Sequence, residues 1–192
     1  RQQKNLILSL LISKGVPMLL MGDEIGRSQG GNNNSWCQNN LLGWMNWDRS
    51  QQDLDLLEYF KYTINIRKKL IKIFNPSPSF LPKNQNHENI PVYHWHGTKV
   101  DSPDWSSWSH TVAFSINKGK TNPMAWIGLN AYSKDIDFQI PNCKYNWLKV
   151  IDTSMSEIFT PLTINEKYVS IKSRSSLLII SEDVFGEEIN IF

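Results

Sequence analysis

Two segments of the chain place apolar residues at helical spacing. Residues 1–14 carry them at i, i+3 and i+4, which predicts an amphipathic helix. These apolar positions are Leu6, Ile7, Leu10 and Leu11. Residues 51–73 carry two adjacent apolar stripes, and Ser50 with Asp53 three residues later is a typical helix start. A second helix with a wide packing face is therefore expected there.

Between the two predicted helices the pattern changes twice. Residues 16–21 form a continuous apolar run after Gly15, typical of a strand buried on both faces of a parallel sheet. Residues 22–50 lack apolar periodicity and are rich in Gly, Asn and Gln, which predicts a long loop. Helix, glycine, buried strand and loop in succession indicate an α/β barrel or a doubly covered sheet.

After residue 80 the apolar residues gather in short runs with β-type composition, separated by turn-forming residues. The runs are 92–96, 111–116, 124–130, 135–140, 147–152, 168–171 and 177–181. Several short strands with turns between them predict an antiparallel sandwich or a small barrel. The change of pattern places a domain boundary near residues 75–80.

Composition and charge exclude several classes of partner. The 20 basic and 18 acidic residues leave a net charge of +2, too balanced to indicate binding to nucleic acid. The basic run 67–69 lies in a predicted helix and is interpreted as its solvated face. No apolar run approaches the ~20 residues that span a membrane, so no membrane partner is expected.

The cysteines and histidines indicate no metal site or cofactor. Cys37 and Cys143 lie far apart without metal-ligand spacing, which argues against a disulfide framework and mildly favours a reducing compartment. His94 and His96 occupy alternate positions of one predicted strand, but no third ligand follows them. Packing in the core or at an interface is the interpretation for both.

The predicted loop has the chemistry of a sugar-binding surface. A carboxamide both donates and accepts hydrogen bonds, as a sugar hydroxyl does. Asn32, Asn33, Asn34 and Gln38 could each meet a glucose hydroxyl, while Trp36 could lie under an apolar sugar face. The alternative is that these amides hold the loop together by bonding its own backbone, as Asn commonly does in turns.

Two motifs resemble a known family in the right order. The sequence from Gly15 to Trp47 resembles the last barrel strand and the following loop of isoamylase-type glycogen and starch debranching enzymes. The segments Ile90-Pro91-Val92-Tyr93-His94-Trp95-His96-Gly97 and Pro103-Asp104-Trp105-Ser106 are similar to their C-terminal sandwich. A predicted helix separates the motifs, as in that family of the α-amylase superfamily.

The resemblance implies a fold and a reaction. Residues 1–77 would be the end of a (β/α)8 TIM barrel, its last helix, strand and helix, and residues 78–192 an antiparallel β-sandwich. The implied reaction is retaining hydrolysis of α-1,6 branch linkages in glycogen or amylopectin by a carboxylate nucleophile and a carboxylic acid. In the family both groups lie on earlier strands. The chain is therefore expected to be the C-terminal piece of a larger enzyme, with no catalytic residue and no activity alone.

The resemblance also implies a set of substrate-binding residues, with Asn34 and Trp36 foremost by family position. The set is Arg27, Asn32, Asn33, Asn34, Trp36 and Gln38. The adjacent acids Asp23 and Glu24 should point in opposite directions, so they cannot easily flank one glycosidic bond. A structural or substrate-shaping role, bonding Arg27 or loop amides, is expected for this pair.

Departures from the family pattern leave alternatives open. Asn39, Asn40 and Leu41 stand where the family usually has Asp, Asn and an acidic residue. A non-catalytic isoamylase-like glucan-binding subunit, or an α-1,4-acting hydrolase of the superfamily, therefore stays possible. Trp105 and Trp108 could bind glucan outside the active site, although packing against the barrel is favoured. Cytoplasm and plastid both remain open, and the oligomeric state is not indicated.

Overall fold

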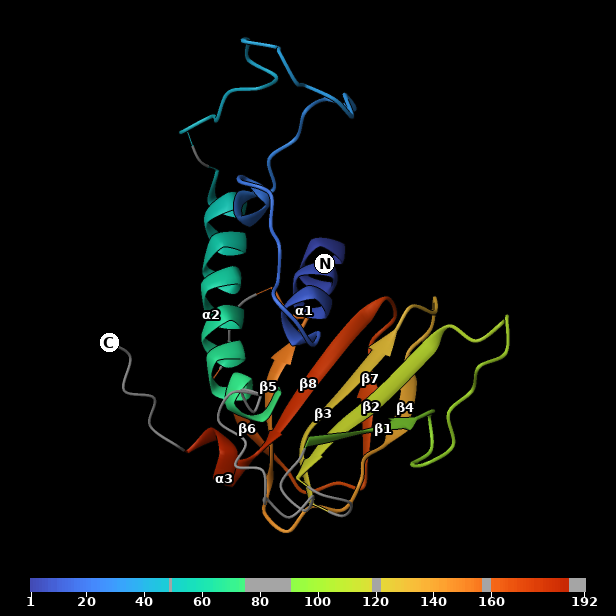
Figure 1. Ribbon diagram of the computed structural model, residues 1–192. Coiled ribbons are helices and arrows are strands. Elements are labelled where there is room, and N and C mark those ends of the chain that lie inside the picture. Colours follow the sequence, from blue (N-terminus) through green and yellow to red (C-terminus); the bar gives the residue numbers. More distant parts are fainter. Residues whose placement is uncertain (49, 75–90, 119–121, 157–159, 187–192) are drawn as a thin grey trace, which may run out of the picture.

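The computed structural model describes residues 1–48, 50–74, 91–118, 122–156 and 160–186, which form three layers. Helices α1 (Gln2–Ile12) and α2 (Gln51–Phe74) cover one face of a six-stranded sheet, and a two-stranded sheet covers the other (Figure 1). A short helix, α3 (Glu182–Phe185), follows the last strand. The strands are β1 (Pro91–His96), β2 (Thr111–Lys118), β3 (Asn122–Asn130), β4 (Ile136–Gln139), β5 (Trp147–Asp152), β6 (Leu162–Ile164), β7 (Tyr168–Ile171) and β8 (Ser175–Ser181).

All described strand pairs are antiparallel. The large sheet has the order β1-β2-β3-β8-β5-β6, and β4 pairs with β7 in the small sheet. The predicted antiparallel β domain is therefore confirmed, and the seven predicted runs correspond to seven of the observed strands. Strand β6 was not predicted, because a strand of three residues gives too short an alternation to recognise.

The two faces of the central sheet explain the apolar pattern of its strands. Leu178 and Ile180 of β8 face the helices, while Leu177 and Ile179 face the small sheet. All four side chains are buried, so β8 is apolar along its whole length. In β3 the indole of Trp126 packs edge to face on Phe138 of the small sheet, with ring centroids 6.0 Å apart. Two apolar cores result, one on each face of the large sheet.

Helix α2 begins as predicted. The Asp53 amide donates to Ser50 Oγ at 3.2 Å, and the Ser50 amide donates to Asp53 Oδ2 at 3.0 Å. This reciprocal capping satisfies two amides that the helix leaves unpaired. Helix α1 is shorter than predicted and buries a rotated face, Ile7, Leu8, Leu11 and Ile12. Leu6, predicted in the apolar stripe, is 71% exposed and lines an open groove of about 240 Å³ beside residues 19–27.

The interpretation of the basic run 67–69 as a solvated face is wrong for its first member. Arg67 is 7% exposed, and its guanidinium donates to the carbonyl oxygens of Leu11, Ser13 and Gly15. The Leu11 carbonyl belongs to the last turn of α1 and the other two follow it, at the end where a helix leaves acceptors unpaired. Arg67 therefore fixes the end of α1 against α2 and directs the chain into residues 16–21.

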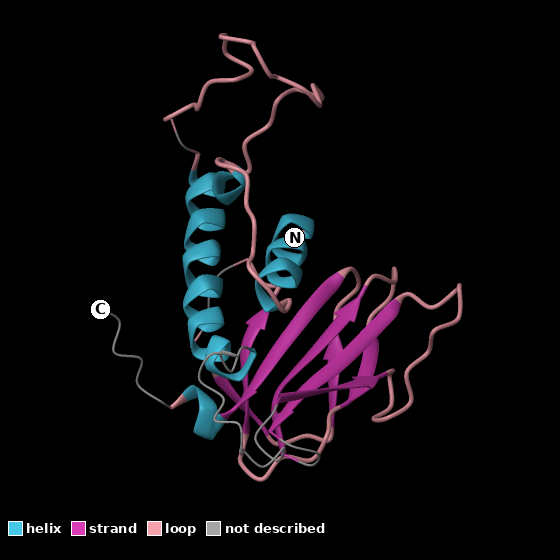
Figure 2. Ribbon diagram, viewed as in Figure 1, coloured by secondary structure: helices cyan, strands magenta, loops and turns pink. Residues whose placement is uncertain are grey.

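The buried strand predicted at residues 16–21 is not formed. This segment has no regular secondary structure (Figure 2). Val16 is 95% exposed, Met18 88% and Leu20 62%. A strand needs a neighbour for its backbone groups, and no described strand of this chain pairs with the segment. The apolar run was recognised correctly, but its burial is not achieved within this chain.

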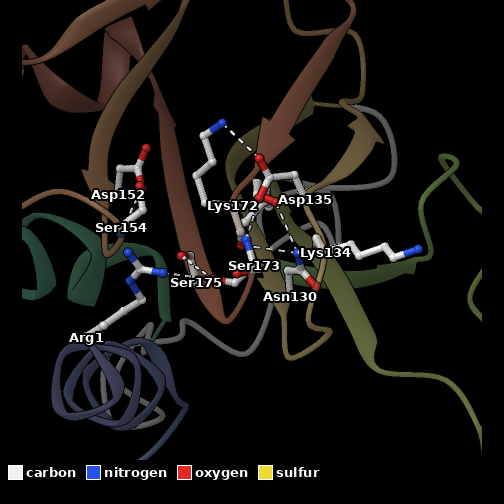
Figure 3. A network of polar contacts seen from close by, with 10 residues as sticks. Arg1, Asn130, Lys134, Asp135, Asp152, Ser154, Lys172, Ser173 and Ser175 are labelled. Carbon is white, nitrogen blue, oxygen red and sulfur yellow. Dashed lines mark hydrogen bonds and ion pairs between the residues drawn. The ribbon is translucent and has the colours of Figure 1, made fainter.

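Polar side chains close the end of the sandwich nearest α1. Asn130, 2% exposed, donates through Nδ2 to the carbonyl oxygens of Lys134 and Ile171 at 2.8 and 3.0 Å. Asp135 accepts from the Ser173 amide, and Arg1 donates to the Ser173 carbonyl (Figure 3). The β3–β4 and β7–β8 turns and the start of α1 are thus held in one network.

Two further expectations concern the domain boundary and a membrane-spanning segment. The predicted boundary between residues 77 and 78 lies outside the described residues. Among the described residues, no helix is both long enough and apolar enough to cross a membrane.

Candidate functional site

The candidate site is the loop of residues 22–48, which projects beyond the first turn of α2 and away from the sheets (Figure 1). As predicted, it contains almost no regular structure, only a 3-10 turn at Asp23–Ile25. Ile25 is buried and anchors this turn. Glu24 Oε2 accepts from the Gly22 amide at 2.8 Å. Glu24 therefore has a structural contact with the Gly22 amide at the start of the loop; Arg27 and the loop amides were the two partners expected from the sequence.

Arg27 connects the start of the loop with Leu42 and Gly43 further along it. Its Nη1 donates to the Met21 carbonyl at 3.3 Å, and its Nη2 donates to the Leu42 and Gly43 carbonyls at 3.3 and 2.9 Å. Its aliphatic stem lies over Gly22, where a Cβ would approach Arg27 Cδ to 2.6 Å. Gly22 has φ +102°, a conformation that glycine adopts without strain. The contacts of Arg27 are thus with the chain itself.

Three of the candidate amides bond within the loop. Asn32 donates through Nδ2 to Gln38 Oε1 at 3.0 Å and accepts the Asn34 amide on Oδ1 at 3.0 Å. Asn34 Oδ1 in turn accepts the Trp36 amide at 3.2 Å. These contacts are the backbone-holding role that the sequence left as an alternative. They use the oxygens of all three side chains, and the side-chain amide hydrogens of Asn34 and Gln38 have no acceptor among the described residues.

The remaining two candidates face solvent. The Trp36 indole is 84% exposed. Asn33 is exposed, and its carboxamide has no hydrogen-bond partner among the described residues. Their neighbours fix the backbone on both sides while these two side chains stay accessible. Among the six candidates they are the pair best placed to contact a ligand.

Further amides, not proposed from the sequence as site residues, also shape the loop. Asn39 Oδ1 accepts from Trp44 Nε1 at 2.7 Å, and Asn40 Oδ1 accepts the Leu42 amide at 3.0 Å. The same bond, from Asn to the amide two residues on, joins Asn46 to Asp48 at 3.0 Å. The recurrence of Asn before turns is the sequence signal that could have indicated this role.

The histidines of β1 do not form a ligand pair. His96 is 3% exposed; its Nδ1 accepts the Asp101 amide at 3.0 Å, and its Nε2 lies 3.0 Å from Ser115 Oγ. Ser115 Oγ donates to Asn117 Oδ1 at 2.8 Å. Burial lowers the pKa of His96, while Asp101 acts in the opposite direction. The described residues contain no group of three or more His, Cys, Asp or Glu placed to hold a metal ion.

A second exposed group of aromatic rings lies on β1 and on the loop between β1 and β2. Trp95 and Trp105 meet edge to face with centroids 5.4 Å apart, and Trp95 also packs on Phe114 at 5.3 Å. Trp95 is 45% exposed, Trp105 64% and Trp108 76%. This aromatic row, from the core at Phe114 to the surface at Trp105, lies remote from the loop of residues 22–48 in sequence.

The six-stranded and two-stranded antiparallel sheets define a mostly antiparallel β domain that resembles the C-terminal domain of isoamylases and pullulanases. Residues 94–182 match the family model described as "Isoamylase 1-3, C-terminal". The resemblance to isoamylase-type debranching enzymes that the motifs indicated is confirmed.

Individual relatives agree with this assignment. The chain is 32% identical over 164 residues to isoamylase 1, chloroplastic, of Oryza sativa subsp. japonica, covering 85% of this chain and 19% of that protein. It is 29% identical over 199 residues to the glycogen operon protein GlgX homologue of Mycobacterium bovis, covering 93% of this chain and 27% of that one. The chain thus spans about a fifth to a quarter of the length of the curated relatives it matches.

Solved structures share the fold. The pullulanase of Anoxybacillus sp. LM18-11, solved with maltotetraose, matches with a TM-score of 0.65 and 16% identity over 93% of this chain and 23% of its own. At this identity the likeness concerns the fold alone. It supports a mostly antiparallel β domain of the kind found in pullulanases.

Proposed function

We propose that this chain is part of a glycoside hydrolase that cleaves α-1,6-glucosidic branch linkages in glycogen or starch. In this proposal residues 1–77 complete a (β/α)8 barrel and residues 78–192 form the domain that supports it. The names of the relatives, isoamylase and glycogen operon protein, support the class of reaction. Their much greater length supports placing the reactive carboxylates outside this chain.

The observation that carries the proposal is the pair of features at residues 16–48. An apolar segment, exposed in this chain, leads directly into a loop whose backbone is fixed by its own amides. In α/β barrels the active site is built from loops that follow the carboxyl ends of the strands. If residues 16–21 pair with neighbouring barrel strands, their side chains become buried and the loop reaches the substrate cleft.

The proposed mechanism follows the retaining pattern. A carboxylate attacks the anomeric carbon while a carboxylic acid protonates the leaving oxygen, and water then hydrolyses the glycosyl-enzyme. Asp23 and Glu24 are not assigned these roles. As adjacent residues they cannot easily flank one glycosidic bond, and the Glu24 carboxylate accepts from the Gly22 amide. The loop is assigned binding instead: Asn33 and Trp36 contact the glucan directly. Asn34 and Gln38 offer their free amide hydrogens, and Asn32 and Arg27 shape the surface.

The aromatic row at Trp95 and Trp105 supports the same arrangement. It lies next to Phe114, which belongs to the core that the sheet shares with α1 and α2. Exposed rings of this size indicate a surface that another part of a protein covers. The proposal assigns it to packing against the barrel.

The test compares this chain with a longer form of the protein that includes the barrel. The longer form should release linear chains from amylopectin and glycogen and leave linear amylose uncut, whereas the 192-residue chain should cleave none of these glucans. Cleavage of amylose would favour the α-1,4-acting alternative. Glucan binding without any cleavage by the longer form would favour the non-catalytic subunit, and debranching by this chain alone would refute the assignment of the acids.

A further inference from the structure

We infer that Arg27 is a positioning residue. It holds together the two ends of the segment of residues 22–43 and thereby keeps Asn33 and Trp36 exposed to a ligand. This inference rests on the proposed function for what the loop binds, but the clamp itself can be tested without it. It replaces the role of substrate contact that the resemblance implied for Arg27.

The geometry of the guanidinium carries the inference. Its two terminal nitrogens donate to three carbonyl oxygens, one of Met21 directly before the loop and two of Leu42 and Gly43 further along it. These carbonyls are separated by about twenty residues of chain, so a single side chain holds both ends together. The planar fork of arginine suits this geometry because its donors have fixed directions.

The surroundings of Arg27 fit a clamp better than a ligand contact. Its Nε is buried and has no hydrogen-bond partner among the described residues. In the orientation that satisfies its carboxamide, Gln29 accepts from Arg27 Nη2 at 3.0 Å and donates to the Asn32 carbonyl at 3.1 Å. The described residues place no carboxylate in an ion pair with Arg27. Backbone and amide dipoles therefore solvate the cation, and its donors point into the protein.

Two glycines allow close approaches where Arg27 joins the chain, one to Arg27 itself and one to a neighbouring carbonyl. Gly22 has the positive φ that turns the chain, and any Cβ there would meet the stem of Arg27. Gly43 lies against the Gln38 carbonyl, where a Cβ would approach to 2.8 Å. Entry and exit of the loop are thus shaped to lie within reach of one guanidinium. The glycines and Arg27 form one unit, which we call the neck.

The first experiment tests, in this chain, whether the neck restrains the backbone of the loop. Backbone amide exchange of residues 28–44 is compared in wild type, Arg27→Lys and Asn33→Ala by mass spectrometry, with the thermal midpoint recorded for each. A lysine keeps the charge but cannot bond both ends. We expect exchange in this segment to rise by about tenfold or more in Arg27→Lys, the factor of one hydrogen bond to a charged group. Asn33→Ala should match wild type, and all midpoints should agree.

The second experiment uses the longer form and separates binding from positioning. In Arg27→Lys the KM for amylopectin should rise, and Gly22→Ala, which disturbs the neck from its other side, should reproduce the rise. Unchanged exchange in Arg27→Lys together with a raised KM would overturn the inference and restore a direct substrate contact. Faster exchange across the whole chain with a lowered midpoint would also overturn it, as general destabilisation. Absence of debranching in the longer form would refute the proposed function while leaving the exchange result valid.

Discussion

A single buried side chain, His96, organises the loop that follows β1. Its ring accepts from the Asp101 amide on Nδ1, so the proton lies on Nε2, which donates to Ser115 Oγ. Burial favours this neutral ring, while the Asp101 carboxylate, with Oδ1 3.3 Å from Nδ1, favours the charged one. The sequence placed His96 in a packing role, which is confirmed, but the hydrogen-bond chain through Ser115 to Asn117 depends on strand register and could not be predicted.

This arrangement predicts a pH dependence of stability. Burial lowers the pKa of His96 below its ordinary value of 6.5, so between the two values the unfolded chain binds more protons than the folded one. The contribution is intact above pH 6.5 and is lost as the pH falls towards the folded-state pKa. The thermal midpoint should drop between pH 7.5 and 5.5, where ~1 kcal/mol corresponds to ~2–4 °C.

Two variants separate the contribution of His96 to the acid sensitivity of the thermal midpoint from that of the carboxyl groups. His96→Gln, which cannot be protonated, should be less stable at pH 7.5 but should lose less midpoint than wild type on acidification. His110→Gln, at an exposed position, serves as the control and should follow wild type. Equal acid sensitivity in wild type and His96→Gln would contradict the role of this ring.

At the scale of elements, the junction of α1 and α2 depends on Arg67. Replacing Arg67 with Met keeps the apolar stem but leaves the three carbonyls at the end of α1 without their donor. Buried acceptors that lose a charged partner cost about 3 kcal/mol together. Urea unfolding of Arg67→Met should show a loss of that order.

Lys68→Met is the control for Arg67→Met, because Lys68 is exposed on the same helix. Its free energy of unfolding should change by less than about 0.5 kcal/mol. A similar loss in both variants would mean that the cost comes from the methionine or from the helix charge, and not from the carbonyl contacts.

The elements show where sequence reasoning succeeds. Helix α2 was predictable because its stripes are long and Ser50 with Asp53 marks its start. The strands were predictable from β-type runs between turn residues, with β6 too short to detect. The run 16–21 was assigned a strand that is absent, because strand formation depends on partners that the local pattern does not contain. In the loop, the sequence identified the amides but not which of them bond one another.

At the scale of the whole molecule, the helices and the β domain share one core. Asn5 of α1 donates to the Arg174 carbonyl at 2.9 Å and accepts from Ser176 Oγ at 3.0 Å, both in the β7–β8 region. Lys69 of α2 donates to the Phe185 carbonyl at 2.6 Å. With these contacts the helix pair should unfold together with the sandwich in one transition, although the sequence divides them at residue 77.

Several apolar side chains of residues 16–21 are not covered by this core. Val16, Met18 and Leu20 lie outside it and are largely exposed. We expect them to cause self-association of the 192-residue chain, because contiguous exposed apolar side chains favour contact between copies. Light scattering should show that the triple variant Val16→Ser, Met18→Ser, Leu20→Ser stays monomeric at concentrations where wild type associates. Its thermal midpoint should be unchanged.

The longer form should respond to the triple variant in the opposite way. If residues 16–21 form a buried barrel strand there, each serine removes an apolar side chain worth about 1.5–3 kcal/mol of burial, and the variant should fail to fold or lose activity. A longer form that tolerates all three substitutions would show that the segment is a surface in both contexts. That result would remove the strongest support for placing these residues in a barrel, whatever the similarity of the loop that follows.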